Sequence, residues 1–432
     1  MVFQRIKNMK NSDFIKSLTV LLTGTLIAQA IGYALAPILT RLYTPSEIGE
    51  LGFYLRLTGF LSAIATLRYE LAIPLPKNHG HSYLLYRLSL MISIIILCFI
   101  FLILGGILFS GYSIGMELWY LLMVILGAAF TVIINLGTNW SVRMGSFSVI
   151  SRQKIVNSFL SNGLKWFFAL FSWSYFGLIL STLIGLMVSS IEIIFNFKKI
   201  KEKFKHFRSS RKTRFLMKNH IEFPLVNLPH VIIDNGRDML VASLIFTHFS
   251  SSIYGSFSHS YNMLRIPMML VGVSLSQLFY NQAIKKYNNN EPILPLFTKI
   301  IGFLTLLSIV PFTTLYFYGE TIFSWVFGAP WALSGRYSET MSFWLLVNFI
   351  LSPISSLPLI IGIQRLAFVF GIISALIQVI PLWLIPHFYG NSEPIFALSL
   401  QIISYSQAVW LMFCVVFYSI FVYKNDLRLK NE

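Results

Sequence analysis

One basic stretch, residues 198–218, interrupts a chain that is otherwise almost continuously apolar. It carries ten Lys or Arg residues and a single acidic residue, Glu202. About two hundred residues of mostly apolar sequence precede it, and about two hundred follow it. Positive residues in membrane proteins collect in cytoplasmic segments. The stretch is therefore predicted to be a cytoplasmic loop between two membrane-embedded halves.

The composition excludes a soluble domain. Only 11% of the 432 residues are charged and 56% are apolar, whereas a soluble protein has about 25% charged residues. Several windows of about 18 residues carry few or no charges, which is typical of membrane-spanning helices. The formal charge of +17 is then explained by basic cytoplasmic segments, and no nucleic-acid partner is expected.

The hydropathy pattern predicts an all-α integral membrane protein with twelve spanning helices. The expected organisation is a six-helix bundle over residues 1–197, a basic cytoplasmic loop over 198–220 and a second six-helix bundle over 221–432. An equal division of this kind is typical of transporters built from two repeats. The expected spans are 17–39, 48–73, 82–110, 116–140, 150–173, 175–197, 221–246, 253–280, 293–318, 339–363, 365–388 and 394–423.

The distribution of basic residues supports this number of spans. With the N-terminus inside, 26 of the 33 Lys and Arg residues fall in cytoplasmic segments, and the outside loops keep only Arg41 and Arg336. A wrong number of helices would scramble this alternation, so both termini are predicted to be cytoplasmic. The longest outside loop, residues 319–338, contains Trp325 and Trp331, which are expected in an interfacial aromatic belt.

Several ionisable residues fall deep within the expected spans. A charge at the centre of a spanning helix costs roughly 2.5–3.5 kcal/mol on insertion scales. Such side chains are therefore expected to face a bundle interior or a water-filled cavity. The six residues are the cations Arg56, Lys165, Arg237 and Arg265 and the anions Asp234 and Asp238.

Four cations against two anions leave a surplus of positive charge. Guanidinium groups bind phosphate through paired N–H donors, so the four cations are the predicted substrate-binding residues for a phosphate-bearing substrate. Asp234 and Asp238 share a helical face with Arg237, which predicts either an ion-coupling pair or a structural ion pair that locks this span to a neighbour. Arg68 and Glu70, near a cytoplasmic helix end, are expected either to extend toward the membrane surface or to pair locally.

No constellation for hydrolysis or group transfer emerges from the sequence. It contains no Walker A pattern, no HExxH and no CxxC pair. Its two cysteines, Cys98 and Cys414, lie in apolar runs without metal-ligand spacing. No catalytic residue, metal or cofactor is expected, and the protein is predicted not to be an enzyme.

Two N-terminal stretches resemble the signature of bacterial O-antigen and capsule-unit flippases of the Wzx type: GTLIAQAIGYALAPILTRLYTPSEIGELGFY at residues 24–54 and ATLRYELAIPLPKN at residues 65–78. These flippases belong to the multidrug/oligosaccharidyl-lipid/polysaccharide exporter superfamily. Later stretches at 223–234, 264–283 and 327–337 are similar to the same family. The resemblance thus covers both halves of the chain.

The resemblance implies two six-helix bundles around a central cavity lined by spans 1, 2, 7 and 8. It implies that the protein flips a short oligosaccharide on undecaprenyl pyrophosphate between the leaflets of the bacterial inner membrane, from the inner to the outer one, in lipopolysaccharide assembly. Arg56, Arg237 and Arg265 fall on three of those four spans, where they would contact the pyrophosphate. Membrane lipids and other polysaccharide assembly proteins are the expected further partners.

Two other functions stay open. A drug or cation antiporter of the same superfamily would need an acidic cavity, and the positive surplus argues against it. A membrane polysaccharide polymerase usually carries a large outside loop with catalytic Arg or His residues, whereas the outside loops expected here are short and acidic.

Overall fold

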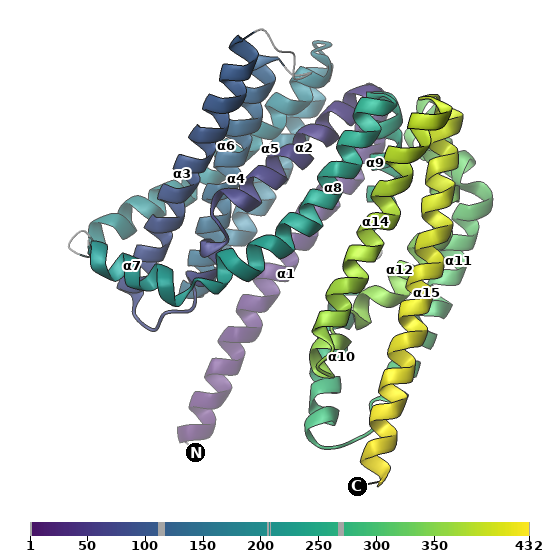
Figure 1. The fold of residues 1–432 in the computed structure, drawn as a ribbon. Coiled ribbons are helices and arrows are strands. Elements are labelled where there is room, and N and C mark those ends of the chain that lie inside the picture. The colour runs from purple at the N-terminus through teal and green to yellow at the C-terminus, as the bar shows by residue number, and fades with distance from the viewer. Residues whose placement is uncertain (1, 111–116, 205–206, 208, 267–271, 432) are drawn as a thin grey trace. The chain divides into compact units, whose positions relative to one another are not determined.

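The computed structural model of the protein consists of helices and the turns that join them (Figure 1). It describes residues 2–110, 117–204, 207, 209–266 and 272–431. No strand occurs within these ranges. The predicted all-α class is therefore confirmed.

The chain divides into two compact units. Helices α2 and α8 contribute to both units, because each crosses a boundary between them. The predicted division into two bundles joined by residues 198–220 stays a prediction. The first unit contains Met1–Tyr43 and Leu51–Met239, and the second contains Thr44–Glu50 and Leu240–Glu432.

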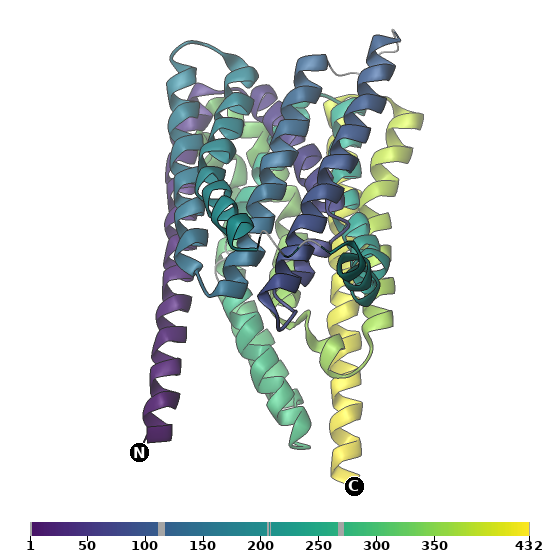
Figure 2. The same cartoon turned by 90° about the vertical axis from the view of Figure 1, so that its left-hand side faces the viewer.

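In the first unit, α1 packs along α5, α5 along α6, and α4 against both α3 and α6. Figures 1 and 2 show α3, α4, α5 and α6 running side by side. A 3₁₀ turn at Tyr69–Ala72 follows α2, and a short π-helix at Phe223–Asn227 precedes α8. The helices are α1 (Val2–Leu42), α2 (Pro45–Ala65), α3 (His79–Phe109), α4 (Leu118–Met144), α5 (Phe147–Ala169), α6 (Ser174–Lys203), α7 (Ser210–Asn219) and α8 (Leu228–His248).

In the second unit, α12 packs against α9, α11 and α15 and carries fully buried core residues such as Met341 and Leu345. Helix α14 packs along α15. The helices are α9 (Ser251–Leu264), α10 (Val273–Asn288), α11 (Leu294–Phe327), α12 (Ala332–Leu351), α13 (Leu357–Ile360), α14 (Gln364–Tyr389) and α15 (Glu393–Asn431).

Seven described helical segments are long and apolar enough to cross a membrane, and each coincides with a predicted span. The other five predicted spans also contain helices, namely α2, α5, α8, α12 and the pair α9 and α10. The chain is a multi-pass membrane protein. The seven segments are Thr23–Leu42, His79–Phe109, Leu118–Met144, Ser174–Lys203, Leu294–Phe327, Gln364–Tyr389 and Glu393–Lys424.

The predicted span 253–280 is not described as one helix. Helix α9 ends at Leu264 and α10 begins at Val273. Residues 267–271, inside this span, lie outside the described residues. The structure therefore supports helix on both sides of this gap.

The segment predicted as the longest outside loop, 319–338, is mostly helical. Helix α11 continues to Phe327, the chain turns at Gly328 with a φ of 105°, and α12 begins at Ala332. The two helices pack tightly against each other. A Cβ atom added to Gly335 would lie only 2.4 Å from Cα of Glu320. Small residues allow such close approach of membrane helices.

One aromatic residue of this segment contradicts the prediction. Trp331 is completely buried, with its ring 4.5 Å from that of His259. Its place in an interfacial belt was therefore predicted wrongly, because the α11–α12 turn folds it into the protein. Trp325 is 80% exposed, so its place in the belt stays a prediction.

Much of the basic stretch is helical and packed. Helix α6 extends to Lys203, and α7 begins after Ser209, whose hydroxyl accepts a hydrogen bond from the backbone N–H of Lys212. Leu216 of α7 is buried in an apolar cluster with Tyr69 and residues of α3. The buried Leu216 side chain packs α7 against the rest of the first unit, and the charged residues of α7 are exposed on its outer face. Lys205, His206 and Arg208 lie outside the described residues.

Replacing Asp426 with alanine is expected to destabilise the second unit by about 1–3 kcal/mol, since it would leave two backbone donors unpaired. The carboxylate of Asp426, on α15, accepts hydrogen bonds from the N–H groups of Ile293 at 3.1 Å and Leu294 at 2.8 Å, and so caps α11. Asp426→Asn keeps one oxygen acceptor and should cost less. Thermal unfolding of the detergent-solubilised protein measures both, and a wild-type midpoint for Asp426→Ala would show that the cap is unimportant.

Candidate functional site

Arg56, a predicted substrate-binding residue on α2, forms an ion pair with Asp238 on α8. Its Nη1 donates to Oδ2 of Asp238 at 3.1 Å. The two residues are 182 positions apart. No acid lies at helical spacing from Arg56 within its own helix, so this partner was not predicted.

The same carboxylate also binds Arg237, the preceding residue of α8. Arg237 donates to Oδ1 of Asp238 from Nη2 at 2.9 Å and from Nε at 3.2 Å. One carboxylate therefore lies between two guanidinium groups, which leaves a net charge of +1. We call these three residues the Arg56–Asp238–Arg237 cluster.

The cluster is only partly covered by protein. The side chains of Arg56, Asp238 and Arg237 are 31%, 24% and 24% exposed. A guanidinium group has five N–H donors, and Arg56 gives one of them to Asp238 without binding any other acceptor in the described parts of the chain. Because a charge facing lipid is costly, the space beside Arg56 is best suited to water or an anion.

The local structure of α8 brings Asp238 within reach of α2. The helix follows the π-helical turn Phe223–Asn227, and such turns occur frequently at functional sites. Gly236, two residues before Asp238, lies close to α2: a Cβ atom there would lie 3.7 Å from Phe60. The two helices are therefore close enough for a direct ion pair.

Asp234, one turn before Asp238, has a different partner. Nδ1 of His230 lies 3.5 Å from its Oδ2, and both side chains are more than half exposed. This contact is an ion pair only when His230 is protonated. The two carboxylates predicted together on α8 thus differ: Asp238 connects α8 to α2, and Asp234 contacts a neighbour on its own helix.

The other two predicted cations are not joined to the cluster by the described contacts. Lys165, on α5, is half-buried, forms no ion pair with the described residues, and accepts a hydrogen bond at its backbone carbonyl from the Tyr43 hydroxyl at 2.7 Å. Arg265, at the end of α9 in the second unit, lies 5.1 Å from the ring of Tyr261, a cation–π distance.

The predicted local pair at the end of α2 is confirmed. Nη1 of Arg68 lies 3.1 Å from Oε1 of Glu70. Glu70 is buried and also accepts a hydrogen bond from the Thr66 hydroxyl. These residues stabilise the turn after α2, where Arg68 adopts a φ of 63°.

A family model described as polysaccharide biosynthesis protein matches residues 38–335. The chain belongs to this family. No curated protein sequence matches the chain.

Solved structures of transporters share the fold of this polysaccharide biosynthesis protein. An inward-facing multidrug resistance MATE family transporter of the MOP superfamily has a TM-score of 0.69 and 13% identity, over 96% of this chain and 99% of the other. The lipid II flippase MurJ in an inward closed conformation has a TM-score of 0.68 and 13% identity, over 96% and 91%. A MOP superfamily transporter from Pyrococcus furiosus has a TM-score of 0.58 and 14% identity, over 96% of both chains.

At these identities the similarity shows the fold alone. The fold is that of MOP superfamily transporters, and it extends over nearly the whole length of each chain. The matched proteins are described as transporters and a flippase.

Proposed function

We propose that this protein is a flippase that translocates lipid-linked oligosaccharide repeat units from the inner to the outer leaflet of the bacterial inner membrane by alternating access. The proposed substrate is an oligosaccharide on undecaprenyl pyrophosphate, of the O-antigen or capsule class used in lipopolysaccharide assembly. Both termini are placed in the cytoplasm, as the distribution of basic residues favours.

The Arg56–Asp238–Arg237 cluster carries this proposal. Arg56 retains unpaired N–H donors beside a second guanidinium group, in a helix long enough to enter the membrane. Guanidinium groups bind phosphate oxygens through paired hydrogen bonds that ammonium groups cannot reproduce. A pyrophosphate is the anion that a membrane protein of polysaccharide biosynthesis would meet in a lipid-linked sugar.

Each predicted residue has a role in this proposal. Arg56 and Arg237 bind the pyrophosphate, and Asp238 holds their guanidinium groups in place. Arg265 and Lys165 are the other two proposed substrate-binding cations. Asp234 is the candidate for ion coupling, because its carboxylate lies 3.5 Å from Nδ1 of His230 and takes no part in the ion pair between α2 and α8.

Family and fold support a flippase over the alternatives. The family is named for polysaccharide biosynthesis, and MurJ, which has a similar fold, is named as a flippase of lipid II. A drug or cation antiporter would favour a negative site, whereas the cluster has a net charge of +1.

Replacing both Arg56 and Arg265 with alanine is expected to abolish export of the surface polysaccharide, since each change removes a cation proposed to hold the pyrophosphate. Loss of one charge-assisted contact costs about 1.5–3 kcal/mol, so each single variant should lose roughly tenfold or more in export rate. Polysaccharide on the cell surface and protein in the membrane fraction are measured together in the producing strain.

Arg336→Ala is the matched control. Arg336, on α12, is exposed, and its Nε lies 4.0 Å from Oε1 of Glu320, which is near the end of α11. It should export normally. Normal export by the Arg56→Ala/Arg265→Ala variant would refute the phosphate site. Increased drug susceptibility of a deletion strain with intact polysaccharide would favour the antiporter instead.

A further inference from the structure

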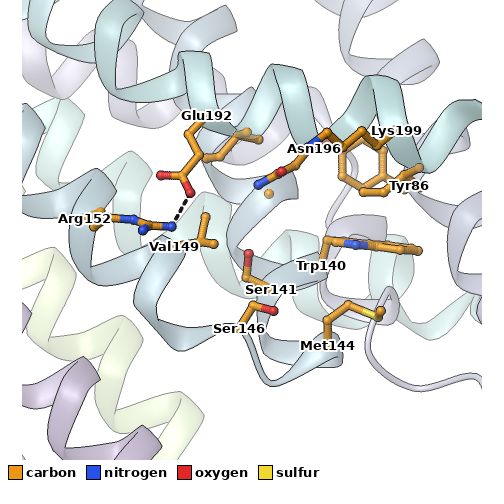
Figure 3. Close-up of a pocket in the computed structure, with 13 residues that line it drawn as sticks. Tyr86, Trp140, Ser141, Met144, Ser146, Val149, Arg152, Glu192, Asn196 and Lys199 are labelled. Carbon is orange, nitrogen blue, oxygen red and sulfur yellow. Dashed lines mark hydrogen bonds and ion pairs between the residues drawn. The ribbon is translucent and has the colours of Figure 1, made fainter.

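A cavity lies in the first unit and shares no residue with the Arg56–Asp238–Arg237 cluster. It has a volume of about 370 Å³ and lies where α4 and α6 end and α5 begins, with Tyr86 of α3 closing one side (Figure 3). Ligand pockets typically occupy about 300–1,000 Å³. The cavity is therefore large enough for a small molecule or a headgroup.

Buried polar side chains line this cavity without protein partners. Trp140, Tyr86 and Ser141 are 7%, 3% and 6% exposed. The indole N–H of Trp140 and the two hydroxyl groups form no hydrogen bond with any described residue, and none of these three polar atoms is fully enclosed by protein, so each is accessible from the cavity that its residue lines. The rings of Tyr86 and Trp140 meet edge to face, 6.1 Å apart. Three unpaired groups that line one cavity indicate a site for a ligand.

Helix α6 adds an amide and a cation to the same wall. Asn196 and Lys199 lie one turn apart, line the cavity, and have no hydrogen-bond or ion-pair partner among the described residues. At the opposite side, Arg152 pairs with Glu192 at 2.5 Å, so the one carboxylate lining the cavity already has a counterion (Figure 3).

The start of α5 favours negative charge in the cavity. Helix α5 begins at Phe147, and the side chain of its N-cap residue, Ser146, makes no capping hydrogen bond. The first backbone N–H groups of a helix have no partner within the helix, and they attract anions. Ser146 and Val149 both line the cavity, and the backbone N–H of Val149 donates to the carbonyl oxygen of Ser146. The amides of Phe147 and Ser148 are the N–H groups of this turn without a hydrogen bond to the described residues.

We propose that this cavity binds the phosphate ester of a small polyol, with glycerol phosphate as the model. Lys199, Trp140 and Asn196 donate to the phosphate oxygens, and the rings of Tyr86 and Trp140 contact the polyol carbons. The same chemistry is presented by the headgroup of phosphatidylglycerol in the bilayer and by a soluble glycerol phosphate. The site does not depend on the flippase proposal, because it uses separate residues.

The test measures binding to the full-length protein in phosphatidylcholine nanodiscs. Calorimetry with sn-glycerol 3-phosphate tests the soluble ester, and native mass spectrometry with phosphatidylglycerol against phosphatidylcholine tests the lipid headgroup. Lys199→Gln should weaken binding about tenfold, and Trp140→Phe, which keeps the ring and removes the N–H, about three- to tenfold. The matched control is Lys198→Gln, because Lys198 is the adjacent exposed lysine, does not line the cavity, and lies over the ring of Phe195.

Each outcome decides the proposal. Weaker binding in Lys199→Gln and Trp140→Phe, with Lys198→Gln unchanged, supports it, and the ligand that shows this pattern identifies the source. Equal weakening by both lysine variants would indicate a diffuse basic surface and overturn it. Absence of binding by both ligands to the wild-type protein would also overturn it. If Trp140→Phe fails to fold, the comparison of the two lysine variants alone still decides.

Discussion

Gly255→Ala is expected to destabilise the protein by about 3 kcal/mol or more and to stop polysaccharide export. A Cβ atom on Gly255, in α9, would lie 1.7 Å from the carbonyl oxygen of Pro45 at the start of α2. The reciprocal position is equally tight, since a Cβ on Gly49 would lie 2.0 Å from the carbonyl oxygen of Ser251. These neighbours are backbone atoms, which cannot rotate aside as a side chain can.

This crossing attaches the start of α2 to the second unit. The hydroxyl groups of Ser46 and Ser251 lie 2.6 Å apart beside it, and Thr44–Glu50 belongs to the second unit while the rest of α2 belongs to the first. Loss of the contact should therefore free one end of a helix that also carries Arg56. Unfolding in detergent and surface polysaccharide in the producing strain measure the two effects.

Gly59→Ala, on α2, is the matched control. No atom lies within 4 Å of a Cβ added there, and alanine favours helix over glycine by about 1 kcal/mol. This variant should be as stable as the wild type or slightly more stable. If Gly255→Ala and Gly59→Ala unfold alike, the close approach of α2 and α9 does not exist in the protein.

Asp238→Ala should reduce export more than tenfold and lower the free energy of unfolding by about 1–3 kcal/mol. The substitution leaves Arg56 and Arg237 without their shared carboxylate, so two positive charges face each other. Removal of one partner from a fully buried ion pair costs about 3–5 kcal/mol. The side chains here are about a quarter to a third exposed, so water screens part of that cost.

A double-mutant cycle separates the ion pair from other effects of these changes. If Arg56 and Asp238 act through their contact, the Arg56→Ala/Asp238→Ala variant will be more stable than the sum of the two single losses predicts, by about 0.5–3 kcal/mol. Chemical unfolding of all four proteins in the same detergent provides the four values. Strictly additive losses would mean that the ion pair contributes nothing.

The class of the protein and the existence of its helices follow from the sequence alone. Water is absent from a bilayer core, so a spanning segment must satisfy its backbone hydrogen bonds internally and becomes a helix. Long apolar runs therefore predicted helices at all twelve expected spans. Arg68 and Glu70 pair within one turn of chain, so sequence proximity predicted their contact.

Which faces of these helices meet depends on packing between segments that are distant in the chain. Lipid and protein interior are both apolar, so hydropathy does not distinguish a side chain that faces lipid from one that faces another helix. Three contacts join residues that are far apart in the chain. They are the ion pair of Arg56 with Asp238, the close approach of α2 and α9 at their glycines, and the packing of the buried Trp331 against His259. The cavity beside Trp140 also forms only when distant segments pack together, because its lining residues come from four helices.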